Sequence, residues 1–185
     1  MIIDSEWVKK NYHGETDFTI PKGATEIGKQ AFMELNSLER IVIPEGVTEI
    51  GVAAFADCEN LKDVVVPNTV TEIGACTFCD CENLRNVTIP ESITKIGKWA
   101  FMRCVNLRNI NLPDNMKDIG KFAFAWCNSL KSVDIPEGVT EIGAFAFADC
   151  ENLKDVVVSN TATEIDEFAF YNCKYLDNVI APSGV

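Results

Sequence analysis

Apolar side chains recur at fixed intervals of 23 residues along nearly the whole chain. The recurring Phe residues are Phe32, Phe55, Phe78, Phe101, Phe124, Phe147 and Phe170. The recurring Leu residues are Leu38, Leu61, Leu84, Leu107, Leu130, Leu153 and Leu176. One such unit cannot fold alone, because burying about eight side chains at ~2 kcal/mol each does not offset an ordering cost of ~1–2 kcal/mol per residue. The pattern therefore predicts a solenoid in which neighbouring units cover each other's apolar faces.

Within one unit the pattern predicts two extended segments followed by a turn. Residues 38–43 alternate between inward apolar and outward positions, which indicates a short strand. Pro44 ends this strand, since Pro donates no ladder hydrogen bond. Residues 47–50 then form a second extended segment. We expect residues 52–58 to form a single helical turn on the convex side, with Phe55 as its inward anchor.

The full repeat resembles a known family at the level of individual residues. Its motif is written most completely as Leu61-x-x-Val64-x-Val66-Pro67-x-x-Val70-x-x-Ile73-Gly74-x-x-x-Phe78-x-x-Cys81. This motif is similar to the BspA-type leucine-rich repeat of the Treponema pallidum class, whose pattern includes Ala-Phe-x-x-Cys, and a period of 23 residues lies within the leucine-rich-repeat range. The resemblance covers the chain from about Phe18 to Pro182. It implies a surface or secreted module that binds proteins and is not an enzyme.

These observations predict an α/β fold. We expect a right-handed leucine-rich-repeat solenoid of seven 23-residue units over residues 18–185, with a parallel concave β-sheet and short helical or irregular convex turns. Residues 1–17 do not fit the repeat and are predicted to form an N-terminal cap, with Ser5 capping a short helix. After Pro182 no polar cap is evident before Val185, so we expect the last core face to be exposed or covered by another molecule.

Charge and composition narrow the classes of partner. A net charge of −12 argues against nucleic acid, which rewards Lys and Arg placed against phosphates. No apolar run approaches the ~20 residues that span a bilayer, which argues against membrane insertion. The first six residues lack the basic start and apolar core of a secretory signal, and this favours the cytoplasm. The resemblance favours the cell surface or secretion, so both locations stay open.

Six of the eight cysteines occupy one repeat position, namely Cys58, Cys81, Cys104, Cys127, Cys150 and Cys173. Equivalent side chains of a parallel stack point the same way and not at each other. We therefore expect buried free thiols that behave as small apolar groups. Cys76 and Cys79 add the only metal-like spacing, together with Cys81, but neither a second such motif nor a nearby His completes a zinc site. No cofactor and no catalytic residue is predicted.

Stacking turns each repeat position into a column, by which we mean the equivalent side chains of successive repeats. The column before the first strand is basic over five repeats in an otherwise acidic chain, and we call it the basic column: Lys62, Arg85, Arg108, Lys131 and Lys154. With Arg40 beside it, and with Val42, Val65, Asn111 and Val157 in the outward strand column, it is a candidate concave face for an acidic protein partner. The alternative is that the basic column and the acidic column Glu26, Glu49, Glu72, Lys95, Asp118, Glu141 and Glu164 solvate the array and compensate each other.

A second candidate surface is aromatic. The position three residues after the repeat's Ile is Gln30, Ala53 or Cys76 in the first units and aromatic in the next four. We call these residues, with Trp126 nearby, the aromatic ridge: Trp99, Phe122, Phe145, Phe168 and Trp126. We expect a half-exposed ridge used for self-association or partner binding, and the alternative is that the rings only pack over one another. The leading prediction is a non-enzymatic, adhesin-like protein-binding module, and its rival is a structural repeat protein that oligomerises through the aromatic ridge or the C-terminal face.

Overall fold

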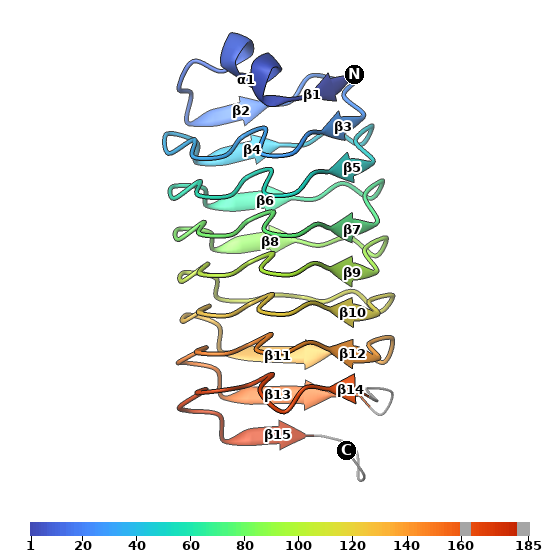
Figure 1. The fold of residues 1–185 in the computed structure, drawn as a ribbon, viewed down its shortest axis with the longest axis vertical. Coiled ribbons are helices and arrows are strands. Elements are labelled where there is room, and N and C mark those ends of the chain that lie inside the picture. Colours follow the sequence, from blue (N-terminus) through green and yellow to red (C-terminus); the bar gives the residue numbers. More distant parts are fainter. Residues whose placement is uncertain (160–163, 181–185) are drawn as a thin grey trace.

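The chain winds into a parallel-strand solenoid of about seven turns that stack along one axis (Figure 1). The computed structural model describes residues 1–159 and 164–180. The turns contribute strands to a first row and to a second row, so the two extended segments expected in a repeat belong to different faces (Figure 1). The leucine-rich-repeat solenoid predicted from the sequence is confirmed.

The first row holds the longer strands. They are β2 (Asp17–Thr19), β4 (Arg40–Val42), β6 (Asp63–Val65), β8 (Asn86–Thr88), β11 (Ser132–Ile135), β13 (Asp155–Val158) and β15 (Asn178–Ile180). The second row holds two-residue strands. They are β1 (Ile2–Ile3), β3 (Glu26–Ile27), β5 (Glu49–Ile50), β7 (Glu72–Ile73), β9 (Lys95–Ile96), β10 (Asp118–Ile119), β12 (Glu141–Ile142) and β14 (Glu164–Ile165).

Among the described residues the strand pairs within a row are parallel, with an offset of 23 residues between repeats and of 24 residues between β1 and β3. In the first row Ile41 pairs with Val64 and Val64 with Val87, which are steps of one repeat. Residues 109–112 interrupt this row, because they pair with neither β8 nor β11 and the row divides into two sheets there. The prediction of a first-row strand in every repeat was therefore wrong for residues 109–112. Asn111 stands where β4, β6 and β8 have Val42, Val65 and Thr88, and Asn has lower strand propensity than these β-branched residues.

The core is a set of side-chain columns that run between the two rows. Phe32, Phe55, Phe78, Phe101, Phe124 and Phe147 are fully buried, and successive rings stack with centroids 5.1–5.5 Å apart. The Leu column from Leu38 to Leu153 is equally buried beside them. Because each ring is covered by the ring of the next repeat, burial is a property of the stack and not of one unit.

The turn after each second-row strand is not the helical turn that the sequence suggested. In residues 52–58 the backbone enters the left-handed region at Ala53 and Asp57, with φ of 55° and 58°. The amides of Ala53, Phe55 and Asp57 donate to carbonyl oxygens of the next repeat at 2.8–2.9 Å. A helix would direct those amides within the segment. Hydrogen bonding between repeats replaces hydrogen bonding within a helix, and the prediction was wrong for that reason.

The glycine of the Ile–Gly pair allows close approach between repeats. A Cβ added at Gly97 would lie 2.8 Å from backbone atoms of Gly74 and Ala75 in the preceding repeat. In the first repeat Gly28 has more room, since its nearest atoms are 3.5 Å away. The glycine column is therefore explained by packing of one turn on the previous one.

An N-terminal helix, α1 (Ser5–Asn11), covers the first turn (Figure 1). The N-cap is Asp4, whose carboxylate accepts a 2.7 Å hydrogen bond from the Trp7 amide, so Ser5 is the first helical residue and not the cap that we predicted. Trp7 and Tyr12 pack edge-on against Phe18, which in turn contacts the ring of Phe32. These aromatic contacts join the helix to the end of the Phe stack. The predicted exposed face after Pro182 lies outside the described residues.

Candidate functional site

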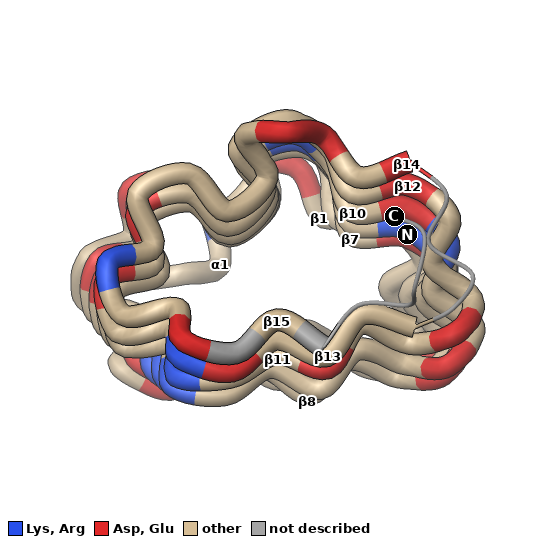
Figure 2. Tube along the Cα trace, turned by 90° about the horizontal axis from the view of Figure 1, so that it is seen from below, with Lys and Arg blue, Asp and Glu red and all other residues tan. Residues whose placement is uncertain are grey.

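The basic column lies at the start of the first-row strands, immediately before their first residues. Viewed along the solenoid axis, the basic positions of successive turns coincide beside this row (Figure 2). Arg85, Arg108, Lys131 and Lys154 are exposed, and Lys62 is half-buried. The structure thus brings the five cations together in one line, with one cation in each of five successive repeats.

Two of the predicted binding cations have partners within the chain. Lys62 forms a 2.7 Å ion pair with Glu39, and Arg40 forms one with Asp17. Within the described ranges no ion pair is formed by the other four members of the basic column, Arg85, Arg108, Lys131 and Lys154. The acidic column runs along the second row instead, so the two columns do not neutralise each other by direct contact.

The outward face of the first row carries exposed apolar groups toward its ends. Val42 and Val65 are 57% and 59% exposed on adjacent strands, and Val157 is 39% exposed on β13. Asn111 is exposed in the middle of the face, where the strand row is interrupted. This face therefore offers apolar contact area beside a line of cations.

A polar hollow of about 390 Å³ opens at that interruption. It is lined by Asn109, Ile110, Asn111, Leu112, Ser132 and Asp134. Arg108 and Lys131 directly precede the two segments that form it. This hollow was not predicted, although Asn111 in place of the β-branched residues of the preceding repeats was the signal that could have indicated it.

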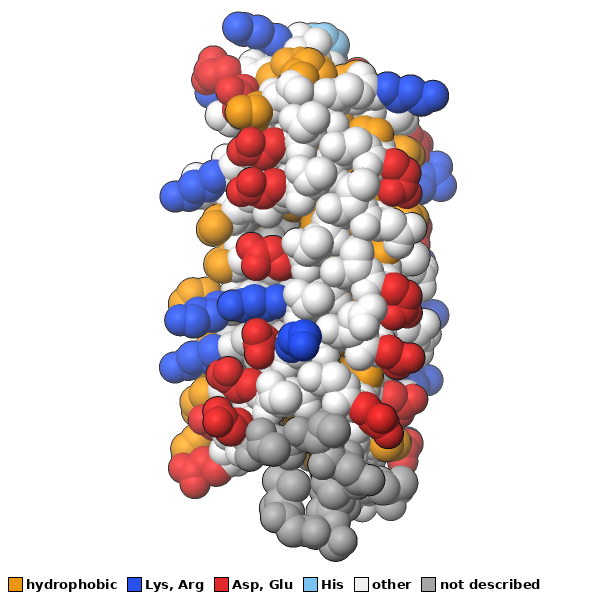
Figure 3. All heavy atoms as spheres, turned by 90° about the vertical axis from the view of Figure 1, so that its right-hand side faces the viewer, with side chains coloured by type: hydrophobic (Ala, Val, Ile, Leu, Met, Phe, Trp, Pro, Cys, Tyr) orange, Lys and Arg blue, Asp and Glu red, His pale blue; other side chains and the backbone are white. Residues whose placement is uncertain are grey.

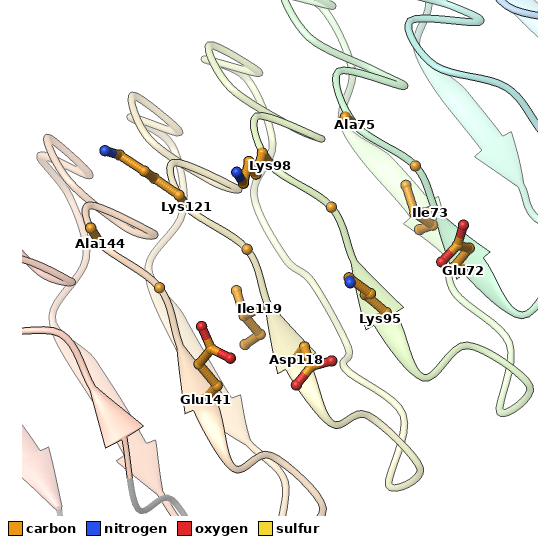
Figure 4. A pocket seen from close by; sticks show the side chains of 14 residues that line it. Glu72, Ile73, Ala75, Lys95, Lys98, Asp118, Ile119, Lys121, Glu141 and Ala144 are labelled. Carbon is orange, nitrogen blue, oxygen red and sulfur yellow. The ribbon is translucent and has the colours of Figure 1, made fainter.

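A larger groove, of about 520 Å³, lies on the second-row face (Figure 4). Its floor is the glycine column at Gly74, Gly97, Gly120 and Gly143. Glu72, Lys95, Asp118 and Glu141 line one side, and Lys98 and Lys121 line the other (Figure 4). Acidic side chains run along this face of the molecule (Figure 3). All the carboxylates of the lining thus lie on one side, together with the ammonium group of Lys95, and the lining contains no Ser, Cys or His. The sequence analysis did not assign a role to Lys98 and Lys121.

The aromatic ridge borders this groove at three of its residues, because Trp99, Phe122 and Phe145 each directly follow a groove residue in the chain. Phe122, Phe145 and Phe168 stack with centroids 4.9 and 5.3 Å apart, and Phe122 also stacks on Trp126 at 6.2 Å. Phe168 is 42% exposed, while Trp99 and Trp126 are each 38% exposed. The rings therefore pack on one another, as one alternative proposed, and they also present an apolar surface to solvent, as expected for a half-exposed ridge.

The cysteine column is buried and reduced. Each thiol donates to the carbonyl oxygen of a Phe in the preceding repeat, as Cys58 does to Phe32 at 3.0 Å and Cys104 to Phe78 at 3.2 Å. Burial raises the pKa of Cys58 to about 12, so the thiol stays protonated and can donate. The prediction of buried free thiols is confirmed, with Cys173 half-buried. The sequence did not reveal the hydrogen bond that explains why Cys is used.

Neither a metal site nor a membrane-spanning helix is evident in the described part of the chain. No three His, Cys, Asp or Glu side chains converge there in a way that could hold a metal ion. Burial raises the pKa of the Cys76 and Cys79 thiols, which is the opposite of what a reactive or metal-poised thiolate needs. Among the same residues no helix is long and apolar enough to cross a bilayer.

Known proteins share this architecture and the sequence pattern of its repeats. The family model described as the BspA type leucine rich repeat region matches residues 10–120 and 94–185, in six copies. The chain belongs to the BspA-type leucine-rich-repeat family. Leucine-rich-repeat proteins of this kind are generally interaction modules and generally not enzymes. No curated protein matches this BspA-type chain.

Solved structures of BspA-type and other leucine-rich-repeat proteins share the fold. The leucine-rich-repeat protein of T. pallidum is 30% identical with a TM-score of 0.75, over 83% of this chain and 72% of that one. A leucine-rich cell surface protein of Faecalibacterium prausnitzii is 29% identical with a TM-score of 0.66, over 91% of this chain and 60% of that one. A leucine-rich-repeat protein of Bacteroides ovatus is 27% identical with a TM-score of 0.71, over 90% and 55%. This chain therefore spans little more than half the length of the latter two.

Proposed function

We propose that this BspA-type protein is a non-enzymatic, adhesin-like module that docks an acidic protein partner on its first-row face. The observation that carries the proposal is the basic column. It keeps four exposed cations without an ion pair, within the described residues, in a chain of net charge −12. Cations that only balanced the acidic surface would be expected to lie beside carboxylates, as Lys62 lies beside Glu39.

The first-row face combines the two contributions that a protein partner needs. A line of like charges attracts an acidic surface over a distance, which raises the association rate and selects against basic proteins. The exposed Val42, Val65 and Val157 supply apolar area that stabilises the docked complex. Polar groups of the hollow at residues 109–112 add hydrogen-bonding capacity in the centre.

The cell surface is the location that the relatives favour. The F. prausnitzii structure is described as a cell surface protein, and it is 29% identical to this chain over 91% of this chain's length. We infer that the present chain acts outside the cell on an exposed bacterial or host protein. Nucleic acid is disfavoured as a partner by the negative charge of the chain as a whole.

The experiment tests purified extracellular-matrix proteins and bacterial surface proteins for binding to the immobilised chain. Arg85, Arg108 and Lys131 are reversed together to Glu in the test variant. A matched control reverses Lys10, Lys29 and Lys117, which are exposed, carry the same total charge and lie outside the first-row strands. We expect an acidic protein to bind the native chain and the control with similar affinity, and the test variant at least tenfold more weakly, corresponding to ~1.4 kcal/mol.

Two results would contradict this function. Equal binding by the test variant would exclude the basic column as the docking site. Binding that does not weaken as the salt concentration rises would show that charge does not drive recognition.

Self-association is a second candidate function, because one observation favours it independently. The aromatic ridge, together with the neighbouring Tyr171 that is 55% exposed, forms an apolar strip that does not include the first-row strands. Exposed aromatic groups of this size are typical of interfaces. A chain that associates through this strip would leave the first-row face open to the partner proposed above.

A further inference from the structure

The aromatic ridge is regular in a way that restricts what can cover it. The rings of Phe122, Phe145 and Phe168 are nearly parallel, with interplanar angles of 5° and 8°. Stacked rings cover one another's faces, so the ridge presents ring edges to solvent. The edges recur once per repeat, at the 4.9 and 5.3 Å spacing of the stack. A partner that meets every ring must carry groups at the same interval, and a second copy of this solenoid does so by construction.

Charge beside the ridge changes sign from one end to the other. The column that directly precedes the ridge residues reads Lys98, Lys121, Ala144 and Glu167. Lys121 shows that this column lies against the ridge, since its Nζ is 5.4 Å from the ring centroid of Phe122. All three charged side chains are exposed, and in the described part of the chain none forms an ion pair.

The outer column of the same face has the same polarity. Lys95 stands at the end nearer the N-terminus, and Asp118 and Glu141 follow it along the groove (Figure 4). Glu164 continues that column and is also exposed. The ridge is therefore flanked by positive charge at its N-terminal end and by negative charge at its C-terminal end.

We propose that the aromatic ridge binds a second copy of this chain in antiparallel orientation, about a two-fold axis that passes between Phe122 and Phe145. This inference rests on the self-association candidate and specifies its geometry. The axis lies in the contact plane, perpendicular to the solenoid, so equivalent columns face each other with the order of repeats reversed. Trp99 then faces Phe168 of the second copy, and Phe122 faces its Phe145. All four aromatic repeats are used.

The antiparallel order also matches the charges at the two ends of the ridge, while Asp118 faces Glu141 of the second copy near its centre. Lys98 faces Glu167 of the second copy, and the symmetry repeats this pair at the other end of the ridge. Lys121 faces Ala144, where no like charge opposes it. A parallel copy would instead bring the basic ends together and the acidic ends together, which costs free energy through like-charge repulsion. Charge complementarity therefore selects one orientation of the copy.

Surface charge reversals test this geometry without disturbing the core. The dimer dissociation constant of the full chain is measured by sedimentation velocity over a wide range of protein concentration. Lys98→Glu and Glu167→Lys are each made alone and then combined, and circular dichroism verifies that every variant is folded. Lys22→Glu is the control for a charge reversal remote from the ridge.

Each single reversal turns two symmetric attractive pairs into repulsive ones. We expect a rise of roughly tenfold or more in the dissociation constant for either single variant. The combined variant re-forms both pairs with exchanged signs, so its dissociation constant should return to within about threefold of the native value. The control should not change it.

Two outcomes would overturn the proposal and they are distinguishable. A dimer that is insensitive to the single reversals, or that is not recovered in the combined variant, excludes the antiparallel register while self-association itself stands. A chain that stays monomeric at every concentration excludes both. Neither outcome bears on the first-row face, whose partner binding is measured with different variants.

Discussion

Replacing one buried ring in the middle of the Phe stack tests whether stability resides in the contacts between repeats. Phe101 is completely buried and its centroid lies 5.4 Å from that of Phe78 and 5.1 Å from that of Phe124. Phe101→Ala removes both ring contacts and leaves a cavity between two repeats. Substitutions of this kind cost about 3–5 kcal/mol in a core that does not collapse.

The same change at the end of the stack provides the comparison. Phe170 is half-buried and stacks on Phe147 at 5.3 Å. It therefore loses one ring contact among the described residues, and Phe170→Ala should cost about 2 kcal/mol. Phe101→Leu is the volume control, because it keeps most of the buried surface, and it should cost about 1–1.5 kcal/mol.

The free energy of unfolding is measured from urea titrations followed by far-UV circular dichroism. In a nearest-neighbour array a central defect weakens two interfaces and separates the flanking blocks. Phe101→Ala should therefore also broaden the transition and lower its apparent m-value, whereas Phe170→Ala should leave the m-value close to native. Equal losses for the two alanine variants would refute the reasoning, because stability would then not depend on the number of stacked neighbours.

Three further outcomes follow from the described contacts. Gly97→Ala should lower the free energy of unfolding by about 1–3 kcal/mol in urea titrations, since the backbone must shift to admit the new Cβ, whereas Gly28→Ala should change it far less. Asp4→Ala should cost about 1 kcal/mol through the lost N-cap, and Ser5→Ala should be nearly neutral, as thermal unfolding of the two variants will show. The buried Cys58 has a folded pKa of about 12 against 9.0 when exposed, so the unfolded state loses this proton first. The contribution of this thiol to the free energy of unfolding is thus present below pH 9 and falls by about 1.4 kcal/mol per pH unit between the two pKa values. In urea titrations above pH 9, the free energy of unfolding should therefore decrease less with pH in Cys58→Ala than in the native chain.

The period of 23 residues determined most of the fold before any coordinate was known. An apolar side chain that returns in constant phase must be buried against its equivalent in the next unit, because no unit has a core of its own. For this reason the Phe and Leu columns were correctly predicted, as were the two extended segments except at residues 109–112. The residues that form each candidate surface could also be predicted, since a column of five cations is evident in the sequence once the period is known.

The tertiary structure decided the features that depend on hydrogen bonding between repeats. The turn at residues 52–58 is not helical, because its amides bind carbonyls of the next unit, and no local propensity encodes that choice. The thiol of Cys58 was expected to be apolar filling, yet it also donates to the Phe32 carbonyl. Which cations remain unpaired was likewise invisible in the sequence. Lys62 and Arg85 occupy the same column. In the structure Glu39 forms an ion pair with Lys62, whereas no described carboxylate forms one with Arg85. Periodicity specifies which residues share a column, and the distances between side chains determine what each column can do.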